Sequence, residues 1–267
     1  MTGQVVVAAD ALSKDVVEDM VGIEGEWELL RSNRWVAWYE VDDEEVARNL
    51  VADLRGAGHP AVAGPPDEAR AVAWRKRNRP TSVGERAEVC FPWVNSSAEI
   101  VIEIDPGGGF GTGDHPSTRL LLEELASNIT GDETVLDVGC GSGVLAIAAV
   151  CFGASRATGI DIDAVGLAAA ETNARRNRIS DRTQFSSTPL KEISGSYDVV
   201  VANIHDEALR AMADGLVSLL SEDGWLGLSG VSPGQLSRLR ATFPKIIFEE
   251  PRQMQDWNAL IGRRQIE

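Results

Sequence analysis

Cysteine is scarce in this sequence, whose 267 residues include only Cys90, Cys140 and Cys151. An odd number of widely spaced cysteines forms no paired disulfide framework and lacks the close cysteine pairs that typify zinc sites. We therefore expect reduced thiols, as in the cytoplasm, and no metal site.

Long apolar runs are absent as well. No apolar stretch approaches the roughly 20 residues that a membrane-spanning helix needs. The first residues, MTGQVVVAADALSKD, lack the basic region and the apolar core of a secretory signal. The sequence therefore predicts a cytoplasmic protein that makes no contact with a membrane.

Basic residues are outnumbered, with 25 Lys and Arg against 41 Asp and Glu and a formal net charge of −16. Such a surface repels nucleic acid, so we expect no direct nucleic-acid binding. The same charge attracts basic partners, although a need for solubility also explains it.

The chain is long enough for one large and one small domain, and its 43% apolar residues supply a core for both. Residues 4–66 follow the order strand, helix, strand, strand, helix, which is typical of a ferredoxin-like α+β layer. We assign residues 1–66 to a small N-terminal domain. Turn residues then lead into residues 67–104, which are predicted to be a linker and a hairpin.

Residues 105–267 alternate between apolar strands and amphipathic helices, the α/β pattern of a parallel sheet covered by helices. The last two apolar runs are close enough to form an antiparallel hairpin, so the predicted sheet is mixed and seven-stranded. Helices are expected at residues 118–128, 164–177, 207–220 and 233–243, with Ser117 and Thr118 as caps of the first.

The most informative stretch is Thr134–Asp163, in which an apolar strand is followed by the glycine turn Gly139–Gly143. A dinucleotide fingerprint needs its third glycine one position later, where this chain has Val144. The GxGxG spacing therefore argues against a nicotinamide or flavin cofactor. It favours a nucleoside without a pyrophosphate, S-adenosylmethionine, which the backbone at Gly139 and Gly141 can approach without a side-chain clash.

Further candidates stand at strand ends. Asp137 closes the strand before the turn, and Asp161 lies 22 residues after Gly139 at the end of the next strand. A carboxylate there can accept hydrogen bonds from both ribose hydroxyls. Asp163 competes for this role but fits better as the N-cap of the following helix. Asn203 ends a later strand, where its amide can contact an acceptor nitrogen or the cofactor.

The segments IDPGGGFGTGDHPSTRL, LDVGCGSGVLAIAA, GIDID, VVANI, GWLGLSGV and DWNALIGR occur in this order. They resemble the ribosomal protein L11 methyltransferase (PrmA) family from about Trp74 to Arg264. The resemblance implies a Rossmann-like class I methyltransferase domain over residues 105–267, S-adenosylmethionine as cofactor, and substrate recognition by residues 1–66. It places cofactor ligands on Thr118, Gly139, Asp161 and Asn203, to which we add Gly141, Phe110 and Asp137 as cofactor-binding candidates.

The implied reaction is methylation of a lysine or N-terminal amino group in a protein such as ribosomal protein L11. A lysine ammonium has a solution pKa of about 10.4, so its proton must be removed before transfer. We select Asn203 and His205 as catalytic candidates, with the histidine as base. The family commonly has Leu or Tyr at this last position. His115, Asp114 and Asp206 lie in loops expected to face the same cleft.

Three alternatives remain open. The first is a methyltransferase that acts on a small molecule in a biosynthetic pathway. The second is a nicotinamide-dependent oxidoreductase with the same sheet, which the missing third glycine disfavours. The third is a binding module that retains the fold without the chemistry.

Overall fold

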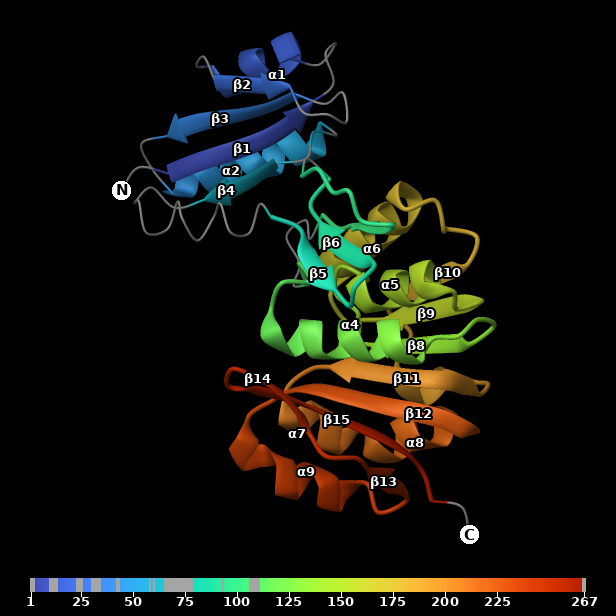
Figure 1. The fold of residues 1–267 in the computed structure, drawn as a ribbon. Helices are drawn as coiled ribbons and strands as arrows, with labels where there is room; N and C mark the ends of the chain where they lie inside the picture. Colours follow the sequence, from blue (N-terminus) through green and yellow to red (C-terminus); the bar gives the residue numbers. More distant parts are fainter. Residues whose placement is uncertain are drawn as a thin grey trace. The chain divides into compact units, whose positions relative to one another are not determined.

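The computed structural model describes residues 3–9, 14–22, 26–29, 35–41, 44–57, 59, 61–64, 79–92, 94–105 and 111–265. They fall into two compact units, one within residues 1–81 and 90–97 and the other within residues 82–89 and 98–267 (Figure 1). The finer division expected at residues 66 and 104 stays a prediction.

The described residues of the smaller unit form an antiparallel sheet and two helices. Its elements are β1 (Gly3–Ala9), α1 (Lys14–Val21), β2 (Glu26–Leu29), β3 (Trp35–Val41), α2 (Glu44–Gly56) and β4 (Ala61–Gly64). The strand order is β2-β3-β1-β4, and each neighbouring pair is antiparallel. This is the split βαβ order of a ferredoxin-like layer. Strand β4 is an element that the sequence interpretation did not include.

A three-stranded sheet, most of whose residues belong to the larger unit, has the order β5-β6-β7. Its strands are β5 (Thr81–Val83), β6 (Ala87–Cys90) and β7 (Ile100–Glu103). The hairpin expected between residues 87 and 105 corresponds to the neighbouring strands β6 and β7.

The main sheet has the order β10-β9-β8-β11-β12-β15-β13, with β14 paired to β15. Its strands are β8 (Thr134–Val138), β9 (Arg156–Ile160), β10 (Thr183–Ser186), β11 (Tyr197–Asn203), β12 (Leu220–Val231), β13 (Ile246–Phe248), β14 (Arg252–Met254) and β15 (Trp257–Arg264). Strands β10, β9, β8, β11 and β12 are parallel to one another, and β15 is antiparallel to β12, β13 and β14. The predicted mixed sheet and C-terminal hairpin are confirmed, but among the described residues the sheet has eight strands and not seven.

Helices cover both faces of this sheet (Figure 1). One face carries α4 (Pro116–Asn128), α5 (Val144–Phe152) and α6 (Ala164–Arg176), and the other carries α7 (Asp206–Ala211), α8 (Ala213–Leu219) and α9 (Leu236–Thr242). We expected a single helix over residues 207–220. This is wrong, because the chain forms two helices there, α7 and α8, divided at Met212. No helix in the described ranges is long and apolar enough to cross a membrane.

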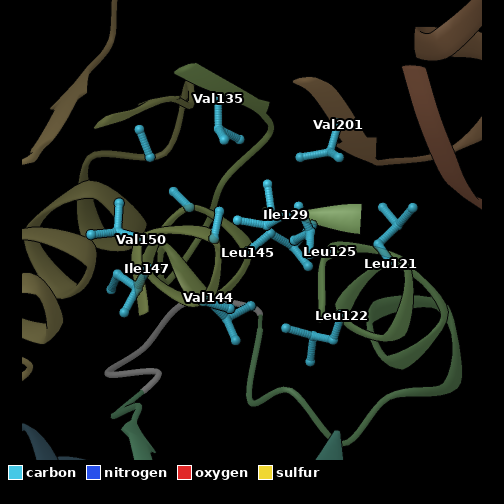
Figure 2. Packing of buried hydrophobic residues seen from close by; sticks show 14 of the residues in the cluster. Leu121, Leu122, Leu125, Ile129, Val135, Val144, Leu145, Ile147, Val150 and Val201 are labelled. Atoms are coloured by element: carbon cyan, nitrogen blue, oxygen red, sulfur yellow. The ribbon is translucent and has the colours of Figure 1, made fainter. Parts of the chain in front are cut away.

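The two faces are built by alternation along the central strands. Val135 of β8 and Val201 of β11 point to the α4–α5 side, where they pack with Leu121 and Leu125 of α4 and with Leu145 of α5 (Figure 2). Their neighbours in sequence, such as Leu136 and Val200, belong to the separate core under α7, α8 and α9. Because both faces are buried, these strands read as continuous apolar runs.

Helix α4 begins at Pro116, two residues earlier than the sequence pattern suggested. Its N-cap is His115, whose Nδ1 accepts from the Ser117 backbone N–H at 3.3 Å and lies 2.8 Å from the Ser117 hydroxyl oxygen. Pro116 takes the first helical position, which suits its fixed φ and its missing N–H. The expectation that Ser117 and Thr118 cap this helix is therefore wrong: both lie inside its first turn and are buried.

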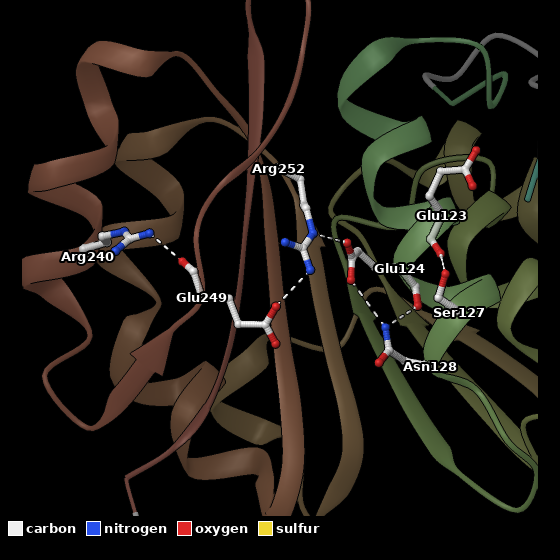
Figure 3. Close-up of polar contacts among 7 residues, drawn as sticks. All are labelled: Glu123, Glu124, Ser127, Asn128, Arg240, Glu249 and Arg252. Atoms are coloured by element: carbon white, nitrogen blue, oxygen red, sulfur yellow. Dashed lines mark hydrogen bonds and ion pairs between the residues drawn. The ribbon is translucent and has the colours of Figure 1, made fainter.

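Helix α4 is also tied to β14 by ion pairs. Arg252 Nε donates to Glu124 Oε1 at 2.7 Å, and its Nη2 donates to Glu249 Oε2 at 2.9 Å (Figure 3). Arg240 of α9 donates to the Glu249 carbonyl oxygen at 2.5 Å, and Asn128 donates to the Glu124 carbonyl oxygen at 2.9 Å. Through Arg252 and Glu249, these contacts connect α4 with the C-terminal strands and with α9.

Candidate functional site

The glycine turn between β8 and α5 has a backbone that only glycine adopts readily. Gly139, Gly141 and Gly143 have φ angles of 76°, 49° and 78°, in the left-handed region. A Cβ atom on Gly139 would lie 2.4 Å from Cγ2 of Ile204. The turn therefore lies directly against the chain that follows β11, with no room for a side chain.

An open cavity of about 500 Å³ lies beside this turn, at the carboxyl ends of the parallel strands. Strands β8 and β11 are adjacent there and their crossovers lead in opposite directions, which makes this the topological switch point where α/β sheets bind ligands. The cavity brings together six residues that were selected from the sequence. They are Thr118, Gly139, Gly141, Asp161, Asn203 and His205.

Asp161 is held by two backbone N–H groups. Its Oδ2 accepts from Gly141 N at 2.7 Å and its Oδ1 accepts from Asp163 N at 2.9 Å. An ionised carboxylate has about four acceptor positions, so each oxygen keeps capacity for a ligand hydroxyl. Asp163 is the N-cap of α6, as predicted, because its Oδ1 accepts from Val165 N at 3.0 Å.

Asn203 and Thr118 approach each other across the sheet edge. Asn203 Nδ2 donates to Thr118 Oγ1 at 2.9 Å, although the two residues are 85 positions apart in sequence. This bond orients the amide and leaves its carbonyl oxygen free to accept a hydrogen bond. The hydroxyl of Thr118 keeps its own proton to donate, so the pair offers both donors and acceptors to the cavity.

Asp137 is fully buried and is not among the residues that line the cavity. Its Oδ2 accepts from Ala146 N in α5 at 3.2 Å, and its Oδ1 has no hydrogen-bond partner within the described part of the chain. Burial raises the pKa of this carboxyl to about 7, the Ala146 N–H opposes the shift, and the charge of Asp161 adds to it. The group lies beneath the glycine turn and is partly protonated near neutral pH.

The remaining sequence candidates fall into two groups. Phe110 lies outside the described residues, and its neighbour Gly111 lines the cavity. The expectation that His115, Asp114 and Asp206 face the cleft is wrong, since none of them lines the cavity. His115 caps α4, and its ring packs edge-to-face on that of Trp257, with the ring centroids 4.9 Å apart.

The buried side chain of Asp206 is occupied elsewhere. Its Oδ2 accepts from Arg210 Nε at 3.0 Å and from Arg238 Nη2 at 2.5 Å. The first ion pair lies within α7, and the second joins the start of α7 to α9. Asp114 is engaged in the same way by a local contact, since the Thr112 hydroxyl donates to its carboxylate.

Several lining residues were missed by sequence reasoning. Ile162, which follows Asp161, has a completely exposed side chain at the cavity. The cavity is also lined by residues 187–190, which follow β10, and by Ala208 and Met212 on the α7 side. Ile162 and residues 187–190 could have been found from their position directly after predicted strands. The α7 residues carry no local signal, because only the fold brings that helix to the cavity.

The cavity fits a nucleoside with an amino-acid arm. Ligand pockets of such size are usually apolar with a few fixed polar groups, and here an apolar wall surrounds a carboxylate, an amide and a hydroxyl. Among the described residues no group of three or more His, Cys, Asp or Glu side chains is arranged to hold a metal ion.

Replacement of Asp137 by Asn is expected to change how stability depends on pH. The folded-state pKa of about 7 lies above the unfolded value of about 3.9, so the aspartate weakens folding progressively as pH rises between them. The free energy of unfolding of the variant, relative to the unaltered chain, should increase from pH 4 to about pH 7 and then level off. Urea titrations across this range measure it; a difference that does not vary with pH would contradict the assignment.

The sequence model of the ribosomal protein L11 methyltransferase (PrmA) family matches residues 5–265. The ribosomal protein L11 methyltransferase of Pelobacter propionicus is 34% identical over 257 residues, which cover 88% of this chain and 83% of that protein. That of Thiobacillus denitrificans is 38% identical over 231 residues, covering 82% and 76%. A crystal structure of the ribosomal protein L11 methylase of Lactobacillus delbrueckii subsp. bulgaricus is similar with a TM-score of 0.66 and 29% identity, covering 70% of this chain and all of that one. The chain therefore belongs to the ribosomal protein L11 methyltransferase (PrmA) family of S-adenosylmethionine-dependent methyltransferases.

Proposed function

We propose that this methyltransferase transfers methyl groups to amino groups, of lysine or of an N-terminus, in a basic ribosomal protein such as L11. The observation that carries the proposal is the meeting of Thr118, Asp161 and Asn203 in one cavity beside the glycine turn. The relatives' names supply the acceptor class. The net charge of −16 favours encounter with a basic protein. We also propose that the reaction takes place in the cytoplasm, where a ribosomal protein would be available as acceptor.

The cofactor would be held by groups at the ends of β8, β9 and β11 and by one residue of α4. Asp161 would accept from the ribose hydroxyls, and the backbone of Gly139 and Gly141 would lie against the cofactor without a side chain between them. Thr118 and Asn203 would contact its amino-acid end. We propose for Asp137 a supporting role under the turn, through its bond to Ala146.

The bound cofactor supplies a methyl group on a sulfonium, which is reactive without further activation. The protein then has to orient a neutral amine in line with that methyl group, a proximity effect. The Asn203 carbonyl oxygen can accept a hydrogen bond from the amine and so direct its lone pair. His205, exposed at the cavity, would take the proton directly or through water.

We further propose that residues 1–66 recognise the protein substrate. Helices α1 and α2 carry six acidic residues in their described sequences, against three basic ones. The family match extends from residue 5, so this part belongs to the same family as the catalytic part. A small-molecule acceptor, the alternative, would give these residues no role in substrate selection.

The acceptor class is tested by transfer of labelled methyl groups into purified ribosomal proteins. We expect label in one small basic protein, whose mass increases by whole methyl groups, and no label when its amino groups have been acetylated beforehand. Label confined to small molecules of a cell extract would support the alternative acceptor. Cofactor binding without transfer to any acceptor would indicate a binding module.

Replacement of Asp161 by Asn is expected to weaken binding of S-adenosylhomocysteine about ten- to a hundredfold, because charged hydrogen bonds to both hydroxyls are lost. Asp163→Asn removes the same charge two residues away and keeps the helix cap, since Asn caps as well as Asp. Its dissociation constant should stay within about twofold of the unaltered chain. Isothermal titration calorimetry measures both; equal weakening in the two variants would assign the effect to charge alone.

Replacement of His205 by Leu is expected to lower turnover about tenfold or more near neutral pH, because the acceptor ammonium loses its base. The deficit should narrow as pH rises toward the pKa of the amine, about 10.4, where solvent removes the proton. Binding of S-adenosylhomocysteine should be little affected. A rate profile with unchanged turnover at every pH would remove His205 from the reaction.

A further inference from the structure

Helix α6 presents one face to the glycine turn. Gly166, Ala170 and Asn173 lie at helical spacing along this face and approach the turn in succession. A Cβ atom on Gly166 would lie 3.2 Å from Cα of Gly141, and a Cβ atom on Gly143 would lie 2.9 Å from Cβ of Ala170. The helix therefore packs so closely against the backbone of the glycine turn that no additional side-chain atom fits between them.

Asn173 extends this contact to a second segment. It is completely buried, and its Nδ2 donates to the Ser142 carbonyl oxygen at 3.0 Å and to the Asp105 carbonyl oxygen at 2.9 Å. Its Oδ1 accepts from Asp105 N at 2.9 Å. The amide thus pairs with Asp105 as a neighbouring strand would, and uses its remaining N–H on the glycine turn.

Ser142 makes the reciprocal connection. Its buried hydroxyl donates to the Gly111 carbonyl oxygen at 2.5 Å. A Cβ atom on Gly111 would lie 2.7 Å from that hydroxyl oxygen, so a glycine is needed at this approach. Asp105 and Gly111 are therefore both bonded, through Asn173 and directly, to the same residue of the turn.

These contacts bear on the cavity although neither Asn173 nor Ser142 lines it. Gly141, which precedes Ser142 in the chain, and Gly111, whose carbonyl accepts the Ser142 hydroxyl, both line the cavity. Gly141 also directs its N–H to Asp161. Any rotation of the peptide at Ser142 would displace the turn's N–H groups and Gly111 together.

We propose that Asn173 and Ser142 are positioning residues that hold the glycine turn and residues 105 and 111 in the arrangement that cofactor binding requires. The inference rests on the cofactor position given under the proposed function. Without the amide, the Ser142 carbonyl would be buried without a donor, and the turn would have to be ordered again each time the cofactor bound.

The chain contains a matched control one helical turn further on. Asn177 Nδ2 donates to the carbonyl oxygens of Glu103 and Asn173, at 2.7 Å and 2.8 Å, and Oδ1 accepts from Glu103 N at 2.9 Å. Each asparagine side chain thus makes three of these hydrogen bonds. Two of them join the backbone of Asp105 or Glu103, and the third joins the glycine turn for Asn173 but helix α6 for Asn177. A structural contribution alone is therefore shared by both asparagines, while a contribution to the cofactor site belongs to Asn173.

The experiment compares Asn173→Ala with Asn177→Ala, measuring the urea midpoint and the dissociation constant of S-adenosylhomocysteine under conditions where both are folded. Both midpoints should fall. The dissociation constant should rise about five- to tenfold in Asn173→Ala, the value of one hydrogen bond, and stay within about twofold in Asn177→Ala. Equal constants in the two variants would overturn the inference.

Ser142→Ala tests the other half of the pair with a change of one atom, and decides the matter should Asn173→Ala not fold. We expect its dissociation constant to rise about fivefold with little loss of stability, because the hydroxyl bond to Gly111 is lost. An unchanged constant would overturn the inference while leaving the proposed function intact. Failure of the unaltered chain to bind S-adenosylhomocysteine would overturn the proposed function, and this inference with it.

Discussion

The glycine turn after β8 has to touch three other segments at once, and the arrangement of the larger unit follows from this constraint. Ile204 comes against Gly139, Ala170 of α6 against Gly143, and the Ser142 hydroxyl against Gly111. A side chain at any of these glycines would push two segments apart. The absence of side chains therefore lets the ends of β8, β9 and β11 converge on a single cavity.

Burial gives the same region its electrostatic character. The Asp137 carboxyl lies beneath the turn, where removal from water raises its pKa to about 7. Asp161, on the cavity side, accepts hydrogen bonds from two backbone N–H groups. Two carboxyl groups of one βαβ unit are thus placed in different surroundings, one under the turn and one facing the ligand.

Much of the fold could be predicted because its signals are local. The glycine spacing, the apolar strands and the strand-end Asp161 and Asn203 are readable without tertiary information. Strand β14 escaped prediction since its three residues carry no apolar alternation and are held by backbone pairing with β15. The cap at His115 was missed because Ser117 and Thr118 have stronger cap preferences, and Pro116 shifts the helix start by imposing the first helical position.

The site was harder to predict than the fold. Thr118 came from the family resemblance, and its contact with Asn203 joins elements 85 positions apart. Asn173 and Asn177 gave no signal at all, because polar residues inside a helical pattern ordinarily face solvent. They bond the backbone of Asp105 and Glu103, which lie 68 and 74 positions away, so only the folded chain brings these groups within reach.

The most direct test of the central claim is a crystal structure of the chain with S-adenosylhomocysteine. We predict the nucleoside beside Gly139–Gly143, with both ribose hydroxyls within hydrogen-bonding distance of the Asp161 carboxylate, and the amino-acid arm directed to Thr118 and Asn203. An ordered ligand elsewhere on the chain, or ribose hydroxyls bonded to another residue, would contradict the account.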